Sequence, residues 1–417
     1  MNMTPLSGSN KIVVVGGGAA GMMAAGMAAQ AGAQVTLLEQ NGRLGKKLLI
    51  TGKGRCNVTN DCPWQDVLQS VPTNPRFLYS ALAGFSPADA KKFFEDYGCA
   101  LKTERGNRVF PVSDRSQSVL DALERFLRAY HVRILPRKAA EIAVSDGRVT
   151  GVKTAEGPVP ADCVILATGG LSYPATGSTG SGYAMAQALG HTIIEPTGSL
   201  VPLVEKGHDC AKMQGLALKN IAVKLVTTKG KTVYEDFGEL LFTHFGLSGP
   251  VILSASAHMA RGEAGYTVRI DLKPALDEKT LDARILRDFS AAPNRDFENS
   301  LSALLPRSMI PVVIARSGID PMQKVNSITK QQRRALLETI KCFSVPIACK
   351  APVEDAIVTS GGVKVSEVSP KTMESKLVKG LYFAGELLDV DAYTGGFNLQ
   401  IAWATGRLAG SASAQEG

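Results

Sequence analysis

The sequence predicts an α/β protein in which a Rossmann-type dinucleotide-binding domain is interrupted by a small β-barrel and a helical segment. Three observations predict this class. A strand–helix–strand motif fills the first forty residues, short alternating strands and then helical periodicity fill the middle, and a strand followed by a glycine-opened helix closes the chain. The two ends therefore belong to one domain, and the middle is an insertion.

Length and composition set the first limits. At 417 residues the chain is too long for one ordinary domain and fits two or three. Hydrophobic residues make up 45% and charged residues 20%, the profile of a globular enzyme with a large core. The net charge of +8 favours solubility and attraction for anionic cofactors. A nucleic-acid-binding face is less favoured, because no basic cluster interleaved with aromatic residues accompanies the charge.

The cysteines and apolar segments bear on the cellular compartment. The 7 cysteines are scattered, odd in number and without zinc-ribbon spacing, so we expect reduced thiols and no metal site. No segment has the ~18 continuous apolar residues of a membrane span, and no signal peptide is recognisable. We expect a cytoplasmic protein without a membrane partner. The sequence does not indicate its oligomeric state.

The first forty residues carry the dinucleotide-binding motif. Residues 11–15 predict a buried parallel strand, which runs into the glycine-rich turn 16–21 and a helix of small residues to about Gly32. A second apolar strand, 34–38, ends at Glu39. Strand, glycine-rich turn, helix, second strand and acid stand in the order of the dinucleotide fingerprint, which is far more specific than the glycines alone.

Each glycine of this motif, and the acid that follows it, has a physical task. Gly16 permits a tight turn, Gly18 lets the backbone approach a pyrophosphate, and Gly21 lets the helix lie close to the sheet. The helix N-terminus offers free N–H groups and a partial positive charge to the phosphates. Glu39 is placed to accept hydrogen bonds from the adenosine ribose. Because its carboxylate would repel a 2′-phosphate, the site favours FAD or NAD over NADP.

A glycine- and cation-rich loop follows the acid. Five Lys and Arg residues fall within the 13 residues 43–55. Such a segment is unusual after a plain NAD site and suits a flavoprotein, in which the chain runs beside the pyrophosphate and then beneath the isoalloxazine. We expect Lys46 and Lys47 to pair with phosphate, and Gly52 and Gly54 to let the backbone donate to flavin N5 or its neighbours.

The run GKKLLITGKGRCNVTN at residues 45–60 resembles the signature of the BaiN-like flavoproteins, also called YhiN-like or aminoacetone-oxidase-like FAD-dependent oxidoreductases. The similarity extends over essentially the whole chain. It implies a Rossmann-type FAD-binding domain interrupted by a β-barrel plus helical insertion. It also implies an NAD(P)H-linked reductase. One member acts on 3-oxo-Δ4 or Δ6 bile-acid intermediates, and a more distant branch is associated with reduction of a uridine in ribosomal RNA.

Further elements are predicted between residues 116 and 189. Residues 116–130 place five apolar side chains on one helical face. A short strand at 132–135 precedes a β-hairpin at 142–153, and the backbone near Ala139–Ala140 is a candidate adenine contact. A buried strand from Asp162 ends in a Thr-Gly-Gly return to the cofactor at 168–170.

The glycine-rich loop 173–183, which opens a helix to about Leu189, could be taken for a nicotinamide phosphate site. It lacks the GxGxxG pattern, and the chain contains one complete dinucleotide fingerprint. We therefore expect no dedicated nicotinamide domain. NADH or NADPH is expected to dock transiently against the flavin.

From about His191 the pattern changes to that of an insertion. Residues 198–273 hold short alternating runs that predict a small barrel, and a loop at 239–250 contains His244. Residues 276–343 have helical periodicity, with basic residues towards their end. The predicted divisions are an FAD-binding domain at 1–191 and 356–417, a barrel-like insertion at 192–275 with 344–355, and a helical insertion at 276–343.

A strand from Leu381 and an acidic turn bring the chain back to the cofactor. This segment resembles the second cofactor motif of FAD Rossmann proteins, in which an acid often meets the ribityl chain. Glu386 takes that position, and Asp389 and Asp391 follow. Two glycines then open a helix to about Leu408, whose N-terminus would stabilise the negative charge of reduced flavin at N1 and O2.

The predicted cofactor contacts come from all of these segments. They are Gly16, Gly18, Ala19, Ala20, Gly21, Glu39, Gln40, Lys46, Lys47, Gly52, Gly54, Arg55, Cys56, Asn57, Ala139, Ala140, Thr168, Gly169, Gly170, Gly385, Glu386, Asp389, Gly395, Gly396, Phe397, Asn398 and Leu399.

Two functions from different classes fit these motifs. The first is a small-molecule reductase, in which flavin N5 delivers hydride to the β-carbon of a conjugated carbonyl and a nearby acid protonates the α-carbon. The candidate donors are Cys56, Tyr393 and His244. Each has a structural alternative, as a small packing residue, a helix cap and a loop histidine respectively.

The second function is an FAD-dependent rRNA dihydrouridine synthase, since uracil is itself a conjugated carbonyl. A flavoprotein oxidase that produces peroxide is a third. The insertion discriminates the first two, because RNA binding needs a continuous cationic face and a steroid-like substrate needs an apolar cavity. The sequence identifies neither the physiological substrate nor the choice between NADH and NADPH.

Overall fold

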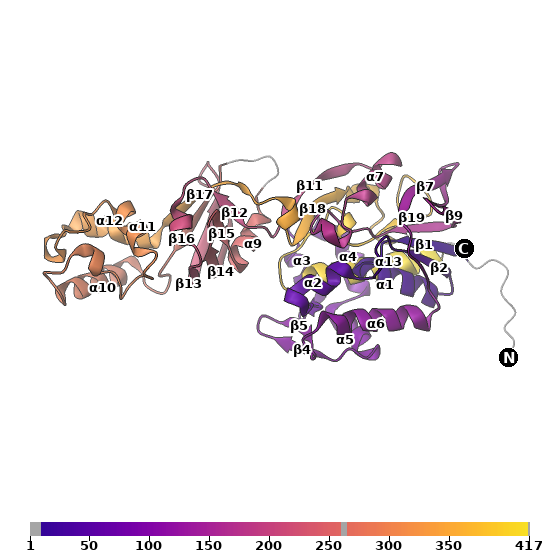
Figure 1. The fold of residues 1–417 in the computed structure, drawn as a ribbon, viewed down its shortest axis with the longest axis horizontal. Coiled ribbons are helices and arrows are strands. Elements are labelled where there is room, and N and C mark those ends of the chain that lie inside the picture. The colour runs from indigo at the N-terminus through magenta and orange to yellow at the C-terminus, as the bar shows by residue number, and fades with distance from the viewer. Residues whose placement is uncertain (1–9, 260–264, 416–417) are drawn as a thin grey trace. The chain divides into compact units, whose positions relative to one another are not determined.

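The computed structural model describes residues 10–259 and 265–415, and the chain forms two compact units (Figure 1). The FAD unit comprises the chain up to Ser199 together with the chain from Val353 onward. The inserted unit is Leu200–Pro352. The predicted α/β class, a Rossmann-type domain interrupted by a barrel and helices, is confirmed.

A five-stranded parallel sheet forms the centre of the FAD unit. Its inner strands are continuous apolar runs because both faces are covered. In the strand order β19-β10-β1-β2-β6, the strands from the two ends of the chain, β1 and β19, both pair with β10, which lies between them. The strands are β1 Lys11–Val15, β2 Gln34–Leu38, β6 Arg133–Leu135, β10 Cys163–Leu166 and β19 Leu381–Phe383.

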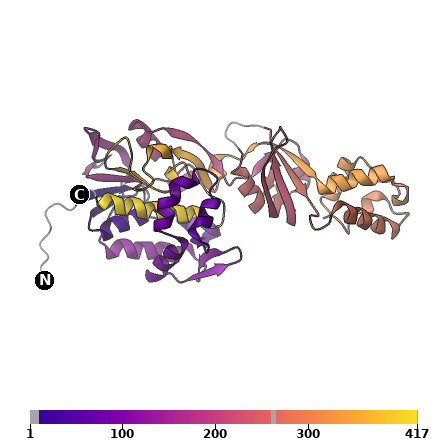
Figure 2. The ribbon, with the colours of Figure 1, turned by 180° about the vertical axis from the view of Figure 1, so that it is seen from behind.

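The N-terminal and C-terminal helices of this unit pack closely through small residues. Helix α1 (Ala19–Gln30) lies against α13 (Phe397–Ala414), the C-terminal helix seen in Figure 2. A Cβ at Gly406 would lie 2.4 Å from the Ala20 carbonyl oxygen, so this approach requires glycine. Helix α6 (Ser116–Ala129) buries the predicted apolar face. The two chain ends thus share one core.

Smaller elements complete the FAD unit. The predicted hairpin gains a third strand, and β11 pairs with β18 in a separate ribbon. The remaining strands are β3 Thr59–Asn60, β4 Leu101–Glu104, β5 Arg108–Pro111, β7 Ala139–Ser145, β8 Arg148–Thr154, β9 Gly157–Pro160, β11 Ile193–Ser199 and β18 Val358–Val363. The remaining helices are α2 Lys46–Gly54, α3 Trp64–Gln69, α4 Tyr79–Gly84, α5 Pro87–Asp96 and α7 Ser181–Ala188.

The inserted unit is a closed antiparallel barrel with a helical extension. The order β12-β15-β14-β13-β16-β17 closes where β12 pairs with β17. The strands are β12 Leu203–Glu205, β13 Ala217–Val226, β14 Thr232–Phe242, β15 Gly246–Ser248, β16 Thr267–Asp271 and β17 Phe343–Lys350. The helices are α8 Asp209–Lys212, α9 Pro250–Ser256, α10 Glu278–Ser290, α11 Ile310–Ser317 and α12 Lys330–Lys341.

The division of the chain differs from the predicted one in two respects. The inserted unit begins at Leu200 instead of residue 192, because β11 pairs with β18 and so stays with the FAD unit. The helical segment 276–343 is not a separate unit, because its apolar side chains share one core with the barrel. Pairing partners far along the chain fix both features, and a local pattern does not reveal them.

Three further findings concern the described residues only. None of their helices is both long and apolar enough to cross a membrane. They contain no group of three or more His, Cys, Asp or Glu side chains arranged to hold a metal ion. The seven cysteines, all within the described ranges, are free thiols.

Candidate flavin site

The turn between β1 and α1 has the geometry that a dinucleotide needs. Gly16 has a φ of +107°, and a Cβ at Gly21 would lie 1.8 Å from the Gly16 carbonyl oxygen. A Cβ at Gly18 would meet no atom within 4 Å. No side chain caps the N-terminus of α1. The turn therefore leaves no room for a side chain at Gly21, where the helix packs against Gly16. It is open at Gly18, where a pyrophosphate would approach.

Glu39 is held rigidly at the end of β2. The residue is 8% exposed, and its Oε2 accepts a hydrogen bond of 2.8 Å from the Gly17 amide. Its Oε1 accepts hydrogen bonds from the backbone amide and the side-chain Nδ2 of Asn41, both at 2.7 Å. Three donors thus fix the carboxylate predicted to meet the adenosine ribose.

The glycine-rich loop after β10 lies against the segment that follows Glu39. Gln40 Nε2 donates to the Gly177 carbonyl at 2.8 Å, and Asn41 Nδ2 donates to the Thr176 carbonyl at 3.1 Å. The loop that could have been a nicotinamide phosphate site is therefore attached to the chain beside the ribose acid. Gln40, predicted as a cofactor contact, uses its side-chain amide to hold this loop.

Lys47 and Glu386, predicted separately from motifs far apart in the chain, meet in the structure. Lys47 Nζ lies 2.7 Å from Glu386 Oε2 and 2.5 Å from Ser172 Oγ. Glu386 Oε1 also accepts hydrogen bonds from the Thr359 amide at 2.8 Å and Ser172 Oγ at 3.0 Å. Sequence reasoning missed Ser172 and Thr359. Their signal is weak, because each stands beside a glycine-rich motif without belonging to its pattern.

The segment 46–57 is more structured than the predicted loop. Its first residues form helix α2, whose N-cap is Gly45, while Lys46 Nζ donates to Asn41 Oδ1 at 3.0 Å. The helix breaks at Thr51, and Gly52 and Lys53 adopt left-handed backbone conformations. Gly54 has a φ of +83°, and Cys56 one of +59°. Left-handed conformations at non-glycine residues persist only where the surroundings impose them.

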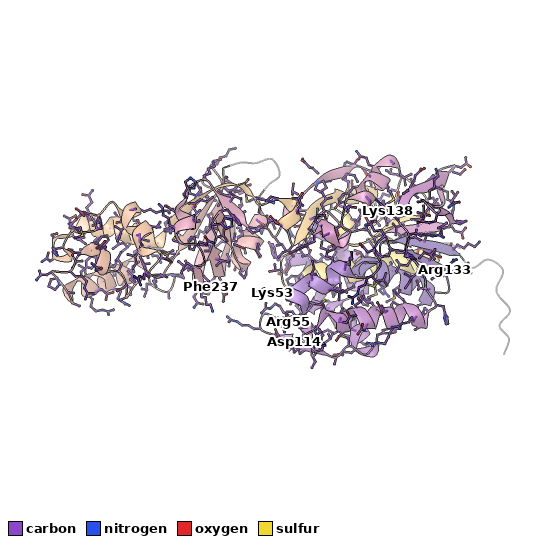
Figure 3. All side chains as sticks on the ribbon, in the orientation of Figure 1. Lys53, Arg55, Asp114, Arg133, Lys138 and Phe237 are labelled. Atoms are coloured by element: carbon purple, nitrogen blue, oxygen red, sulfur yellow. The ribbon has the colours of Figure 1, made fainter. Side chains whose placement is uncertain are left out.

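Arg55 is the anchor that imposes this backbone. Its Nε donates to Asp114 Oδ1 at 2.8 Å, its Nη2 pairs with Glu104, and its guanidinium lies 4.1 Å from the ring centroid of Phe110 (Figure 3). The hydrogen bond from Arg55 lowers the pKa of Glu104. Arg55 was predicted to contact the cofactor. In the structure its guanidinium pairs with Glu104 in β4 and with Asp114, three residues after β5 ends.

Two buried polar atoms of predicted cofactor residues lack a protein partner. Asn57 Oδ1 and Thr168 Oγ1 make no hydrogen bond within the described parts of the chain. An unmade hydrogen bond of a buried polar atom costs about 1–3 kcal/mol. Such atoms fit a site that receives a polar ligand. Together with the open space at Gly18, they show that the residues present fit FAD.

The N-terminus of α13 closes the predicted site. Gly395 and Gly396 have φ values of +127° and +99°, and no side chain caps the helix. The Asn398 side chain bonds both the amide and the carbonyl of Ala392, at 2.9 and 2.7 Å. Asn60 Nδ2 holds the Gly395 carbonyl at 3.0 Å. The helix end is thus rigid, and its free N–H groups suit a negatively charged ligand.

Four further predicted residues lie at four different places in the structure. Ala139 pairs with Thr154 at the start of β7, and a Cβ at Gly170 would lie 2.3 Å from Thr359 Oγ1. The Asp389 carboxylate and carbonyl accept from Asn74 Nδ2. His244 is exposed and belongs to the inserted unit, between β14 and β15.

Of the proposed donors in the FAD unit, Cys56 is fully buried, and burial raises the pKa of its thiol to about 12. Tyr393 is half-buried, and its amide donates to the Ser70 carbonyl at 3.0 Å. The thiol therefore packs in the core, whereas the tyrosine stands just before the glycines that open α13.

Comparison with known proteins identifies the family of this chain and two similar enzymes with different activities. The family described as HI0933-like protein Rossmann domain matches residues 10–412. The 3-dehydro-bile acid delta(4,6)-reductase of Clostridium scindens is 35% identical over 412 residues, covering 97% of this chain and 99% of that protein. The ribosomal RNA dihydrouridine synthase of Escherichia coli is 32% identical over 394 residues, covering 94% and 95%.

Among solved structures, a 3-ketosteroid-delta4-(5alpha)-dehydrogenase from Rhodococcus jostii RHA1, in complex with 4-androstene-3,17-dione, aligns with a TM-score of 0.50. The two sequences are 16% identical, and the alignment covers 98% of each chain. This likeness concerns the fold alone.

Proposed function

This chain belongs to the HI0933-like family and is an FAD-dependent oxidoreductase, and from that premise we propose that it reduces a carbon–carbon double bond conjugated to a carbonyl group. When bound, the flavin supplies a hydride from N5 to the β-carbon of the substrate, and NADH or NADPH restores the reduced flavin. The proposed substrate is a small-molecule enone, such as a 3-oxo-Δ4 bile-acid or steroid-like intermediate.

The observation that carries this proposal is the similarity to the bile-acid reductase, which spans nearly the full length of both proteins. The geometry supports it in the FAD unit. The uncapped N-terminus of α13 would stabilise the negative charge of a reduced flavin. The Lys47–Glu386 ion pair joins the two ends of the chain at the same site. A reductase needs this charge stabilisation, because its reduced cofactor must persist until the substrate binds.

The residues have distinct proposed roles. Tyr393 is the proposed proton donor to the α-carbon, because it is half-buried and precedes the glycines that open α13. Cys56 is proposed to anchor the segment 46–57 by packing its side chain in the core, since that side chain is fully buried. His244, the third donor predicted from the sequence, is exposed on the inserted unit. Proton donation by an oriented side chain typically contributes about 10²–10⁴-fold to a rate.

A second candidate is the reduction of a uridine in ribosomal RNA, and the distribution of charge favours it. Residues 200–352 contain 21 Lys and Arg against 15 Asp and Glu, a net charge of +6, whereas the rest of the chain carries +2. Among these cations, Lys219, Lys229 and Lys231 are exposed on or beside β13 and β14. A polyanionic substrate would bind such a unit through its phosphates.

Product analysis separates the two substrates. The FAD-loaded enzyme is incubated anaerobically with NADH or NADPH and either a 3-oxo-Δ4 steroid or rRNA from a strain lacking this gene. The proposed function predicts a saturated ketone, with two hydrogens added across the former double bond and, in deuterated water, deuterium at the α-carbon. If rRNA gains dihydrouridine and the enone is unchanged, the second candidate replaces the first. Failure of both substrates contradicts the reductase proposal.

A matched variant sharpens this test. The triple charge reversal K219E/K229E/K231E changes exposed side chains of the inserted unit and no residue of the flavin site. RNA turnover should then fall at least ~10-fold at physiological salt, whereas enone turnover should stay within about twofold of the wild type.

A further inference from the structure

Tyr183 is a buried side chain whose hydroxyl group has no hydrogen-bond partner. It lies in the first turn of α7 and is 6% exposed. No protein atom of the described residues accepts a hydrogen bond from its hydroxyl or donates one to it. A buried tyrosine hydroxyl usually finds a partner, so this exception requires an explanation.

Besides burial, the charges of two carboxylates raise the pKa of this hydroxyl, although neither carboxylate forms a hydrogen bond with it. Burial raises the pKa of Tyr183 most, and the charges of Glu386 and Asp389 raise it further. Glu386 accepts its hydrogen bonds from Lys47, Ser172 and Thr359, and Asp389 accepts from Asn74. The phenol therefore stays protonated and can act as a hydrogen-bond donor. Glu386 Oε1 already accepts two hydrogen bonds, whereas Oε2 accepts one from Lys47 and can accept another.

The position of the ring places this donor next to predicted cofactor residues. A Cβ built at Gly362, in β18, would lie 3.1 Å from Tyr183 Cε1 and 2.4 Å from the Leu387 carbonyl oxygen. Leu387 ends the short 3₁₀ helix η7 (Gly385–Leu387), which carries Glu386. The tyrosine ring thus packs against Gly362 of β18, which in turn lies against the segment that carries Glu386.

A second partnerless hydroxyl lies at the same helix. A Cβ at Gly182 would lie 2.0 Å from Thr168 Oγ1, so this hydroxyl contacts the first turn of α7 beside Tyr183. Thr168 Oγ1 is one of the buried atoms without a partner in the described residues, and Thr168 is a predicted cofactor contact. The first turn of α7 thus carries one unpaired buried hydroxyl and contacts a second, which fits a site that receives a polar ligand.

We propose that Tyr183 is a cofactor-binding residue whose hydroxyl donates a hydrogen bond to a ribityl oxygen of FAD beside Glu386. A ribityl hydroxyl both accepts and donates hydrogen bonds. It can therefore accept from the phenol and donate to the carboxylate at the same time. A phosphate suits this place less well, because the carboxylates of Glu386 and Asp389 would repel it. The proposal depends on FAD binding and is independent of which double bond the enzyme reduces.

The Tyr183→Phe variant tests this role through two effects of opposite sign. Removing a partnerless buried hydroxyl should raise the melting temperature of the FAD-free protein by about 2 °C. Losing the donor should raise the dissociation constant of FAD about fivefold. Calorimetry measures the first effect, and titration by flavin fluorescence quenching measures the second. An unchanged FAD dissociation constant overturns the proposal, whatever happens to the melting temperature.

The control variant is Tyr130→Phe, in the same unit. The Tyr130 hydroxyl already has a partner, since it accepts a hydrogen bond of 2.8 Å from Gln30 Nε2. This variant should leave FAD affinity unchanged and should not raise the melting temperature. Equal weakening of FAD binding in both variants would mean that the loss is general, and would overturn the assignment to Tyr183.

Two further measurements test the ribityl assignment and the donor role. Riboflavin, which lacks the phosphates, should lose affinity for Tyr183→Phe by the same factor as FAD. A loss confined to FAD would move the contact to the pyrophosphate or the adenosine, both of which riboflavin lacks, and would overturn the ribityl assignment. Should Tyr183→Phe fail to fold, site-specific 3-fluorotyrosine at 183 retains the donor and should keep the FAD dissociation constant within about twofold of the wild type. A fivefold rise there would contradict the donor role.

Discussion

The two units of this protein differ in how completely they satisfy their own polar groups. Six buried side-chain atoms within the described residues lack a hydrogen-bond partner, and all six lie in the FAD unit. They belong to Asn57, Thr168, Tyr183, His191, Thr197 and Asp391. The described residues of the inserted unit contain no such atom, although that unit also has a buried hydrophobic core.

The difference indicates a division of labour. A unit with unpaired buried atoms around glycine-lined openings fits a buried polar cofactor. A unit that is internally satisfied and carries a net charge of +6 can act through its surface. The FAD unit thus has the features expected of the cofactor-binding unit. The predictions below test which residues of the FAD unit hold the flavin and which hold the fold of that unit.

The largest effect is expected from Gly21→Val. Its Cβ would lie 1.8 Å from the Gly16 carbonyl oxygen, in backbone that cannot retreat without opening the β1–α1 turn. We expect destabilisation of the FAD unit by about 4 kcal/mol and loss of flavin from the purified protein. Denaturant titration and the flavin-to-protein absorbance ratio measure these losses. Gly18→Ala is the control, because its Cβ meets no protein atom within 4 Å. The control should fold normally, and a fully flavinated Gly21→Val protein would refute this account of the turn.

Glu386→Gln should have the next largest effect. It removes the carboxylate that pairs with Lys47 at 2.7 Å, but leaves an oxygen to accept from the Thr359 amide. The side chains of Lys47 and Glu386 are about one-fifth exposed, so we expect roughly tenfold weaker FAD binding and not a complete loss. Titration of the FAD-free protein measures this change. Retention of wild-type affinity would show that the ion pair lies outside the flavin site.

Arg55→Gln should act on the rate more than on binding of the nucleotide. The guanidinium holds the left-handed segment 52–54 through Asp114 and Glu104, so its loss should loosen the backbone proposed to face flavin N5. We expect kcat to fall about tenfold with the KM for NADH or NADPH unchanged, and the visible flavin spectrum to shift. Arg55→Lys should recover part of the rate. A raised KM with an unchanged kcat would place Arg55 at the nucleotide instead.

The smallest effect concerns the pH dependence of stability. His191 is buried between α7 and β11, where its Nε2 lies 2.8 Å from Ser375 Oγ and its Nδ1 lies 3.4 Å from Glu367. Burial lowers the pKa of His191, and this outweighs the attraction of the Glu367 carboxylate. The neutral imidazole is therefore the form that the fold favours.

Because the folded pKa of His191 lies below the unfolded value near 6.5, its contribution to stability is complete above that pH. It is lost as the pH falls below the unfolded pKa and through the folded one. We expect the melting temperature to fall between pH 7 and 5, and His191→Asn to reduce that fall. An identical fall in the variant would assign the pH dependence to other groups.

The sequence was most informative where function depends on local geometry. The tight turn at Gly16, the open approach at Gly18 and the close packing at Gly21 follow from single residues within one short motif, and the structure has all three. The parallel sheet and the barrel were also predictable, since periodicity and apolar runs are local signals.

Other features depend on contacts that a local pattern does not contain. The partners of Arg55 come from residues 104 and 114, so a guanidinium in a cation-rich loop was assigned to the cofactor. The sequence did not identify Tyr183 as a site residue, because only the structure shows that its hydroxyl is buried without a hydrogen-bond partner. The boundary at Ser199 depends on the pairing of β11 with β18, which lie far apart in the chain.

The central claim is that a flavin in the FAD unit passes a hydride from a nicotinamide nucleotide to a conjugated double bond. Anaerobic stopped-flow absorbance of the FAD-loaded protein tests it most directly. The account predicts that NADH or NADPH bleaches the visible flavin band and that a 3-oxo-Δ4 enone then restores it without oxygen. If neither nucleotide bleaches the flavin, or if the bleached flavin recovers only with oxygen, the claim is contradicted.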